Sequence, residues 1–158
     1  MLSQFECLSL AMDGRYATDL ELQFIVDYVQ SFQPRLEAYL KLQELESTLV
    51  QQTYDKMRSI DASLFNYGNA DASLKWKQDT IRVLRYTAIA VLMNDPDTLR
   101  ERFLLWFQTV MRAFGTQRSC DMTYRVLQSI VKQHLSPSEA DLVCPILELN
   151  RCTLGVIA

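Results

Sequence analysis

Cysteine and histidine side chains are the ones in this chain best able to bind a metal or act as nucleophiles, and there are few of them. The only histidine is His134, and the cysteines are Cys7, Cys120, Cys144 and Cys152. Cys144 and Cys152 are eight residues apart with no histidine close by, which is not the spacing of a zinc site. We therefore expect no bound metal and free, mostly buried thiols, with His134 helping to cap the C-terminal end of its helix.

Trp76 and Asp79 are the remaining side chains that could serve a ligand, because they are spaced about one helical turn apart. The ring of Trp76 could stack on a bound molecule or simply fill space, and the second role is favoured. Asp79 could accept a hydrogen bond from a ligand nitrogen or form an ion pair on a nearby turn, and again the second is favoured. The basic residues within reach are Lys75, Arg82 and Arg85. No Gly-rich phosphate loop, nucleophile elbow or paired-carboxylate motif occurs, so we expect no enzymatic activity.

The elements that must position these side chains are helices, because apolar residues recur every three or four positions along most of the chain. Pro34 is expected to open one helix, and Gly115 to end another. A helix is also expected to begin at Thr18 or Asp19, where Glu21 would complete a capping box with Thr18. Expected helices cover residues 3–12, 18–33, 36–57 (one helix, or two with a bend near 47–48), 74–93, a helix capped by Asp95 or Asp97 that runs to 114, 119–134 and the segment from 136 onward. The one clear irregular loop covers residues 61–73, where Asn, Asp and Gly gather.

Length and composition limit the class of protein. The chain has 158 residues, which suits a single domain, with 49% hydrophobic and 22% charged residues. Only four glycines and four prolines leave little material for the turns of an all-β fold, so composition also favours helices. The net charge of −3 and the scattered basic residues argue against nucleic acid as a partner. No apolar run approaches the ~18 residues of a membrane span and the start lacks a secretory signal, so we expect a cytoplasmic protein with no membrane insertion.

Two sequence segments resemble the central helix pair of the phycobiliproteins, most closely allophycocyanin β-type subunits. They are the run from Asp79 to Tyr86, which contains Leu84-Arg85-Tyr86, and the run Asp95-Pro96-Asp97-Thr98-Leu99-Arg100-Glu101-Arg102. Residues 11–16 resemble the turn between the two N-terminal helices that this family adds to a globin core. The order and spacing of these segments carry the resemblance from the N-terminus to about Gly115, after which it fades.

The resemblance implies an all-α, globin-like fold with two extra N-terminal helices. One domain, 1–158, would then contain an N-terminal helical extension for dimerisation, 1–33, and a globin-like core, 34–158. In the family a cysteine three residues before the aspartate forms a thioether with an open-chain tetrapyrrole, a bilin. Trp76 stands at that position, and indole cannot make the bond. Trp76 and Asp79 would thus mark a vestigial bilin pocket with no covalent cofactor, and a bilin thioether at Cys144 is not expected.

The resemblance also implies where subunits meet. In phycobiliproteins the aspartate equivalent to Asp13 pairs across the subunit interface with the arginine and tyrosine equivalent to Arg85 and Tyr86. The leading hypothesis is therefore a chromophore-free subunit that pairs with itself or with an allophycocyanin-type or phycocyanin-type subunit. It would act in phycobilisome assembly, remodelling or photosystem attachment, at the cytoplasmic face of the thylakoid membrane. The alternative is a sensor or carrier that binds a bilin or another tetrapyrrole without a covalent bond.

Overall fold

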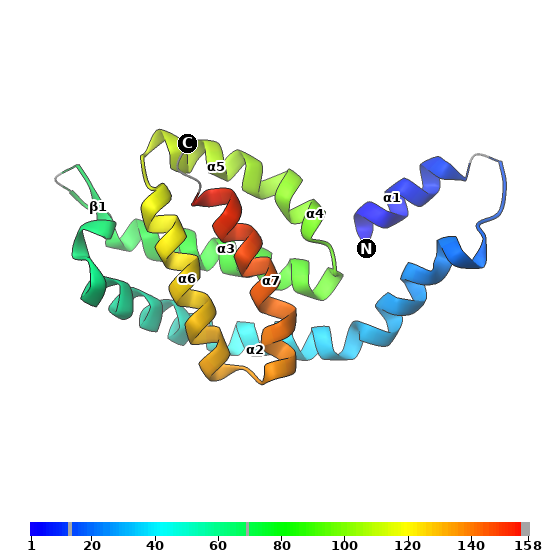
Figure 1. Cartoon of the computed structure of the whole chain (residues 1–158), viewed down its shortest axis with the longest axis horizontal. Helices are drawn as coiled ribbons and strands as arrows, with labels where there is room; N and C mark the ends of the chain where they lie inside the picture. Colours follow the sequence, from blue (N-terminus) through cyan, green and yellow to red (C-terminus); the bar gives the residue numbers. More distant parts are fainter. Residues whose placement is uncertain (13, 69, 156–158) are drawn as a thin grey trace.

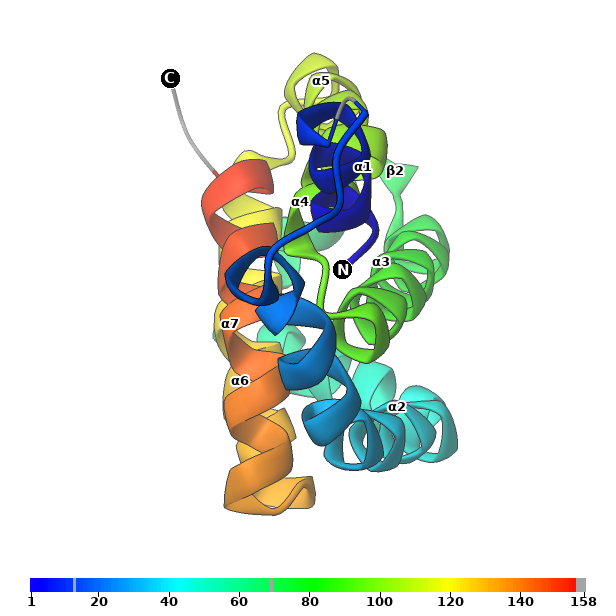
Figure 2. The same ribbon diagram turned by 90° about the vertical axis from the view of Figure 1, so that its right-hand side faces the viewer.

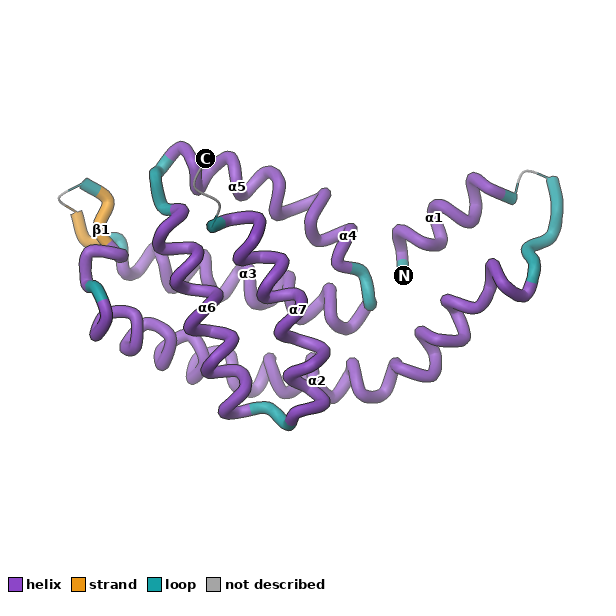
Figure 3. The backbone as a smooth tube through the Cα atoms, in the orientation of Figure 1, coloured by secondary structure: helices purple, strands orange, loops and turns teal. Residues whose placement is uncertain are grey.

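Helices make up almost the whole of the computed structural model, which describes residues 1–12, 14–68 and 70–155 (Figures 1 and 3). The α-helices are α1 (Leu2–Ala11), α2 (Asp19–Ile60), α3 (Ser73–Met93), α4 (Pro96–Leu99), α5 (Leu105–Ala113), α6 (Gln117–His134) and α7 (Pro137–Leu154). A π-helical turn, η2 (Arg100–Leu104), joins α4 to α5. No helix among the described residues is long and apolar enough to cross a membrane.

The 42-residue helix α2 is the longest element, and its start was predicted correctly. Thr18 and Glu21 form a complete capping box, in which each side chain bonds to the backbone N–H of the other residue. Arg15 adds two bonds to Glu21 of 2.6 and 2.9 Å, and these hydrogen bonds lower the pKa of Glu21 to about 2. The carboxylate of Glu21 is therefore charged at neutral pH and supports the positive end of the helix dipole.

The prediction that Pro34 opens a helix is wrong, because Pro34 lies inside α2. Proline removes one backbone hydrogen bond from a helix interior but has a helical φ, so a long helix with good contacts on either side can tolerate it. Arg35 supplies one such contact by donating from its guanidinium to the carbonyl oxygen of Val91 at the end of α3, at 3.1 Å. No bend separates two helices at residues 47–48 either, since α2 runs to Ile60.

The predicted loop at 61–73 contains short regular elements. A 3-10 turn, η1 (Ala62–Phe65), begins at Asp61 and is followed by two antiparallel two-residue strands, β1 (Asn66–Tyr67) and β2 (Ala70–Asp71). Gly68 has a φ of +58°, a value that glycine adopts without strain. The hairpin lies at the opposite end of the molecule from α1 (Figure 3).

The core lies between α2, α3, α6 and α7, where apolar faces of all four helices meet. Its fully buried members include Leu42, Met57, Val83, Leu127 and Leu147. Removing such side chains from water is the main favourable contribution to folding. A capping box of Ser136 and Glu139 begins α7, and Gly115, with a φ of +64°, follows the end of α5 as predicted.

At the N-terminus, α1 and the first part of α2 form an arm, residues 1–33, that stands out from one end of the helical bundle (Figures 1 and 2). Its two helices touch through Phe5 and Phe24, whose rings meet edge to face with centroids 5.1 Å apart. Much of its apolar surface faces solvent. The exposed fractions are 96% for Tyr16, 86% for Leu20 and 66% for Val29.

Asp95 holds the free end of the arm against the bundle. Its carboxylate is almost fully buried and accepts hydrogen bonds from the backbone N–H and the hydroxyl of Ser3, both at 2.9 Å. It also accepts one from the N–H of Thr98, so the same side chain is the N-cap of α4. Burial by itself raises the pKa of Asp95, but these hydrogen bonds outweigh it and hold the pKa well below its usual range.

We expect the substitution Asp95→Ala to loosen α1 and to lower the free energy of unfolding by about 1–2 kcal/mol, because a helix cap and two bonds to Ser3 are lost together. Hydrogen exchange of the amides in α1 and urea unfolding measure the two effects. The control is Asp97→Ala in the first turn of α4, where no described residue bonds to the side chain. Equal changes in both variants would show that Asp95 has no special role.

The effect of Asp95 should also depend on pH. Because its folded pKa lies below the unfolded value of about 4, its contribution to stability is complete above that pH and is lost as the pH falls toward the folded value. The difference in free energy of unfolding between wild type and Asp95→Ala should therefore be smaller at pH about 3 than at pH about 6.

Candidate functional site

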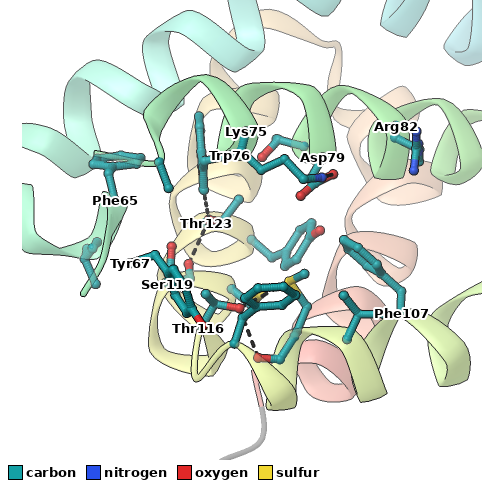
Figure 4. A pocket seen from close by; sticks show the side chains of 18 of the residues that line it. Phe65, Tyr67, Lys75, Trp76, Asp79, Arg82, Phe107, Thr116, Ser119 and Thr123 are labelled. Atoms are coloured by element: carbon teal, nitrogen blue, oxygen red, sulfur yellow. Dashed lines mark hydrogen bonds and ion pairs between the residues drawn. The ribbon is translucent and has the colours of Figure 1, made fainter. Parts of the chain in front are cut away.

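A cavity of about 290 Å³ lies beside Trp76 and Asp79, between α3 on one side and α5 and α6 on the other (Figure 4). η1 and β1 close one end through Phe65 and Tyr67. Its walls are mostly apolar and strongly aromatic. The structure brings Trp76 and Asp79 together with part of the segment that was predicted as a loop, 61–73.

Trp76 forms one wall of the cavity and is held firmly in place. Its indole N–H donates to the hydroxyl of Thr123 at 2.9 Å, and that hydroxyl donates to the carbonyl oxygen of Ser119 at 2.7 Å. The ring also meets Phe65 edge to face, with centroids 5.1 Å apart, and packs near Tyr54. Trp76 is half-buried and leaves the cavity beside it open.

Asp79 projects from α3 toward the same cavity (Figure 4). Its Oδ1 pairs with the ammonium of Lys75, one turn earlier, which is one of the three partners the sequence allowed. Lys75 is largely exposed, while the side chain of Asp79 is only 15% exposed. Among the described residues no other group bonds to this carboxylate, so Oδ2 is free to accept a hydrogen bond.

Two cavity residues on α6, Cys120 and Tyr124, were not identified from the sequence. Tyr124 is 97% buried, since its exposed fraction is 3%, and no described residue hydrogen bonds to its hydroxyl. Burial raises the pKa of the Cys120 thiol to about 12, with a smaller contribution from the nearby charge of Asp79. This thiol is therefore protonated at neutral pH and a poor nucleophile. The available signal was the spacing of four residues between Cys120 and Tyr124, which places both on one face of a helix.

Arg85 and Tyr86, the predicted interface residues, lie on the exposed side of α3. The guanidinium of Arg85 makes a two-point ion pair with Glu46 on α2, at 2.7 and 2.8 Å, and this pairing raises the pKa of Arg85. The ring of Tyr86 stacks on Phe103, with centroids 4.2 Å apart, and remains 43% exposed. Asp13, the third predicted interface residue, lies outside the described residues.

The thiols differ from the expectation of mostly buried cysteines. All four are free, but Cys7 and Cys152 are exposed, and Cys144 is half-buried outside the cavity. Cys144 packs against the edge of the core, whereas Cys7 and Cys152 lie on exposed faces of α1 and α7. His134 ends α6 as expected, but its ring bonds to Gln52 on α2 at 2.7 Å and not to the end of its own helix.

Comparison with known protein families gives one clear result. The model of the family described as phycobilisome protein matches residues 9–154. The chain belongs to this family. The helical bundle with its N-terminal arm is accordingly the globin-like phycobiliprotein fold. No curated protein matches the chain.

The family match corrects one expectation. The resemblance was expected to fade after Gly115, but the match continues through α6 and α7 to residue 154. The match therefore includes helices in which no short family motif was recognised.

The cavity is small and its wall carries a thiol. Cys120 is the only cysteine among the described residues that line it. The volume of about 290 Å³ is about twice the ~150 Å³ that holds one benzene ring.

Replacing Thr123 with valine should release the ring of Trp76. The indole N–H would lose its partner, which should cost about 1–2 kcal/mol of stability and increase quenching of Trp76 fluorescence by acrylamide. The measurement needs Trp106→Phe in the background so that emission comes from Trp76 alone.

Thr53→Val is the matched control. Thr53 is also buried in a helix and donates to the carbonyl four residues earlier, but it has no bond to a tryptophan. We expect little change in Trp76 quenching for this variant. Equal quenching in both variants would mean that Thr123 does not hold the ring.

Proposed function

We propose that this phycobilisome family protein is a subunit without a covalent chromophore that works through protein–protein contacts. The observation that supports the proposal is that Thr123 holds the indole of Trp76 at the position where the resemblance puts the pigment-binding cysteine. A hydrogen bond and two aromatic contacts build this side chain into the wall, which favours a packing role for it over a role as a pigment anchor.

The N-terminal arm supports a role in assembly. It leaves large apolar side chains exposed on both of its helices, and exposed apolar surface of this kind marks interaction sites. Its residues 1–33 also contain five acidic residues and one arginine, a net charge of −4. A partner surface that is basic and apolar would complement this arm in both charge and hydrophobicity.

A matching surface exists on the same chain. The segment from α3 to α5, residues 73–113, contains seven basic and four acidic residues, a net charge of +3. Its exposed apolar side chains include Tyr86, Ile89, Leu105 and Trp106. We therefore propose that the arm of one subunit docks against α3 and α5 of another, with Asp13 meeting Arg85 and Tyr86. Arg85 would share its charge between Glu46 and the partner.

The partner would be a second copy or a subunit of the allophycocyanin or phycocyanin type. Inserted in a phycobilisome at the cytoplasmic face of the thylakoid membrane, the protein would occupy a subunit position that carries no pigment. Such a subunit can end a stack, interrupt energy flow, or serve in remodelling and in attachment to a photosystem.

Arg85→Ala should weaken self-association about tenfold, because the pairing of Arg85 with Asp13 would be lost at the interface. Asp13→Ala should have a similar effect. Sedimentation velocity over a range of concentrations measures the association constant, and circular dichroism checks that the fold is kept.

Arg125→Ala on α6 is the control for Arg85. Arg125 is also exposed and paired with a carboxylate, that of Asp121, but lies outside the α3 to α5 surface. We expect its association to match wild type. If Arg85→Ala also matched wild type, the proposed interface would be wrong.

Protein produced in a bilin-making cell should show no visible absorbance, before or after denaturation in acidic urea. Colour that leaves the chain on denaturation and gel filtration would favour the alternative, a sensor or carrier that binds a tetrapyrrole without a covalent bond. Colour that stays would reveal a thioether, and Cys120→Ser would then show whether the cavity thiol forms it.

A further inference from the structure

A pair of polar side chains is buried where α3 packs against α7. Thr87 on α3 and Asn150 on α7 are each 0% exposed. The side-chain amide of Asn150 donates from Nδ2 to the hydroxyl oxygen of Thr87 at 2.7 Å. Among the described residues no other hydrogen bond between two side chains is fully buried. The contact between α3 and α7 is therefore directional at this point, whereas the core around it is largely apolar.

The pair leaves one polar atom without a partner. Oδ1 of Asn150 is the only buried side-chain nitrogen or oxygen among the described residues that forms no hydrogen bond. Exchanging the oxygen and the nitrogen of the amide does not change this, because the single hydroxyl of Thr87 can meet only one end of it. An incompletely bonded amide in the core costs free energy, and leucine has nearly the same shape without polar atoms. Stability alone therefore does not account for asparagine at position 150.

The neighbours of Thr87 on α3 offer the amide no second partner. A shift of one helical turn moves a residue by ~5.4 Å and brings the residues three or four positions away into its place. On α3 these residues are all buried and apolar: Val83, Leu84, Ala90 and Val91. A shifted α3 would thus leave both ends of the Asn150 amide unpaired, a penalty that apolar contacts alone do not impose.

We propose that Asn150 is a positioning residue, which holds α3 in one register against α7 through Thr87 and does so at a net cost in stability. A single buried asparagine fixes the register of coiled coils in the same way. This inference goes beyond the assembly role and does not depend on it. The register of α3 matters because this helix carries both Trp76 in the cavity wall and Arg85 on the exposed side.

The stability of three variants tests the cost of the pair: Asn150→Leu, Thr87→Val and the double variant. Thr87→Val leaves the whole amide unpaired and should raise the unfolding equilibrium constant about tenfold or more. Asn150→Leu leaves only the hydroxyl of Thr87, which can donate to the carbonyl oxygen four residues earlier, as Thr53 and Thr123 do. In urea unfolding we expect the constants of Asn150→Leu and of the double variant to equal or fall below that of wild type.

The register itself is measured by the distance between spin labels on α3 and α7. Cys152 on α7 is exposed and takes one label, and Gln78→Cys at an exposed position of α3 takes the other. The background carries Cys7→Ser, Cys144→Ser and Cys120→Ala so that no other thiol is labelled. We expect one narrow distance distribution when the pair is intact, and a broader or two-peaked distribution in the double variant.

Thr80→Val is the matched control. Thr80 is a second buried threonine of α3, 4% exposed, and its hydroxyl forms no hydrogen bond to a described side chain. Removing this hydroxyl should leave the distance distribution narrow, because no contact between α3 and α7 is lost.

Two results would overturn the proposal. A double variant with the same narrow distribution as wild type would mean that apolar packing fixes the register of α3. An unfolding constant of the double variant about tenfold or more above wild type would mean that the pair stabilises the core. If Thr87→Val fails to fold, Asn150→Leu and the double variant still decide the question, because neither contains an unpaired amide.

Discussion

The structure depends on the continuity of α2. This one helix forms a wall of the core along most of its length and then continues past Pro34 into the arm. Because a helix is stiff, its direction within the core determines where the arm points. Arg35, bonded to the end of α3, and Asp95, bonded to Ser3, then hold the base of the arm and its free end. These contacts at both ends of the arm thus hold its exposed apolar surface in a defined position relative to the bundle.

The carboxylate of Asp95 has two structural roles, as the cap of α4 and as the acceptor of hydrogen bonds from α1. As the N-cap of α4 it helps to begin the helical run that continues through η2 into α5. As the acceptor for Ser3 it ties α1 to that same run. The arm and the α5 side of the cavity therefore share a support, since α5 carries Phe107 and Met111. A continuous stretch of helix therefore joins the arm to one wall of the cavity.

The cavity keeps its open volume because Trp76 is held to one side of it. The hydrogen bond from the indole N–H to Thr123 and the edge-to-face contact with Phe65 hold the ring against the wall. What remains is a mostly apolar, aromatic space toward which Asp79 projects from α3. A side chain that merely filled this space would leave no such volume.

The sequence alone determined the helical class, the capping box of Thr18 and Glu21, the stop at Gly115 and the family. These features depend on spacings of three or four residues or on short motifs, which are readable along the chain. It led to the wrong helix start at Pro34, because proline is acceptable in the first turn and its tolerance inside α2 depends on packing. The pairs that build the site and the arm join distant residues: Arg85 with Glu46 over 39 positions, Trp76 with Thr123 over 47, and Ser3 with Asp95 over 92. Only the tertiary structure decided them, because no periodic rule relates residues on different helices, and the same is true of the cavity volume that their packing leaves.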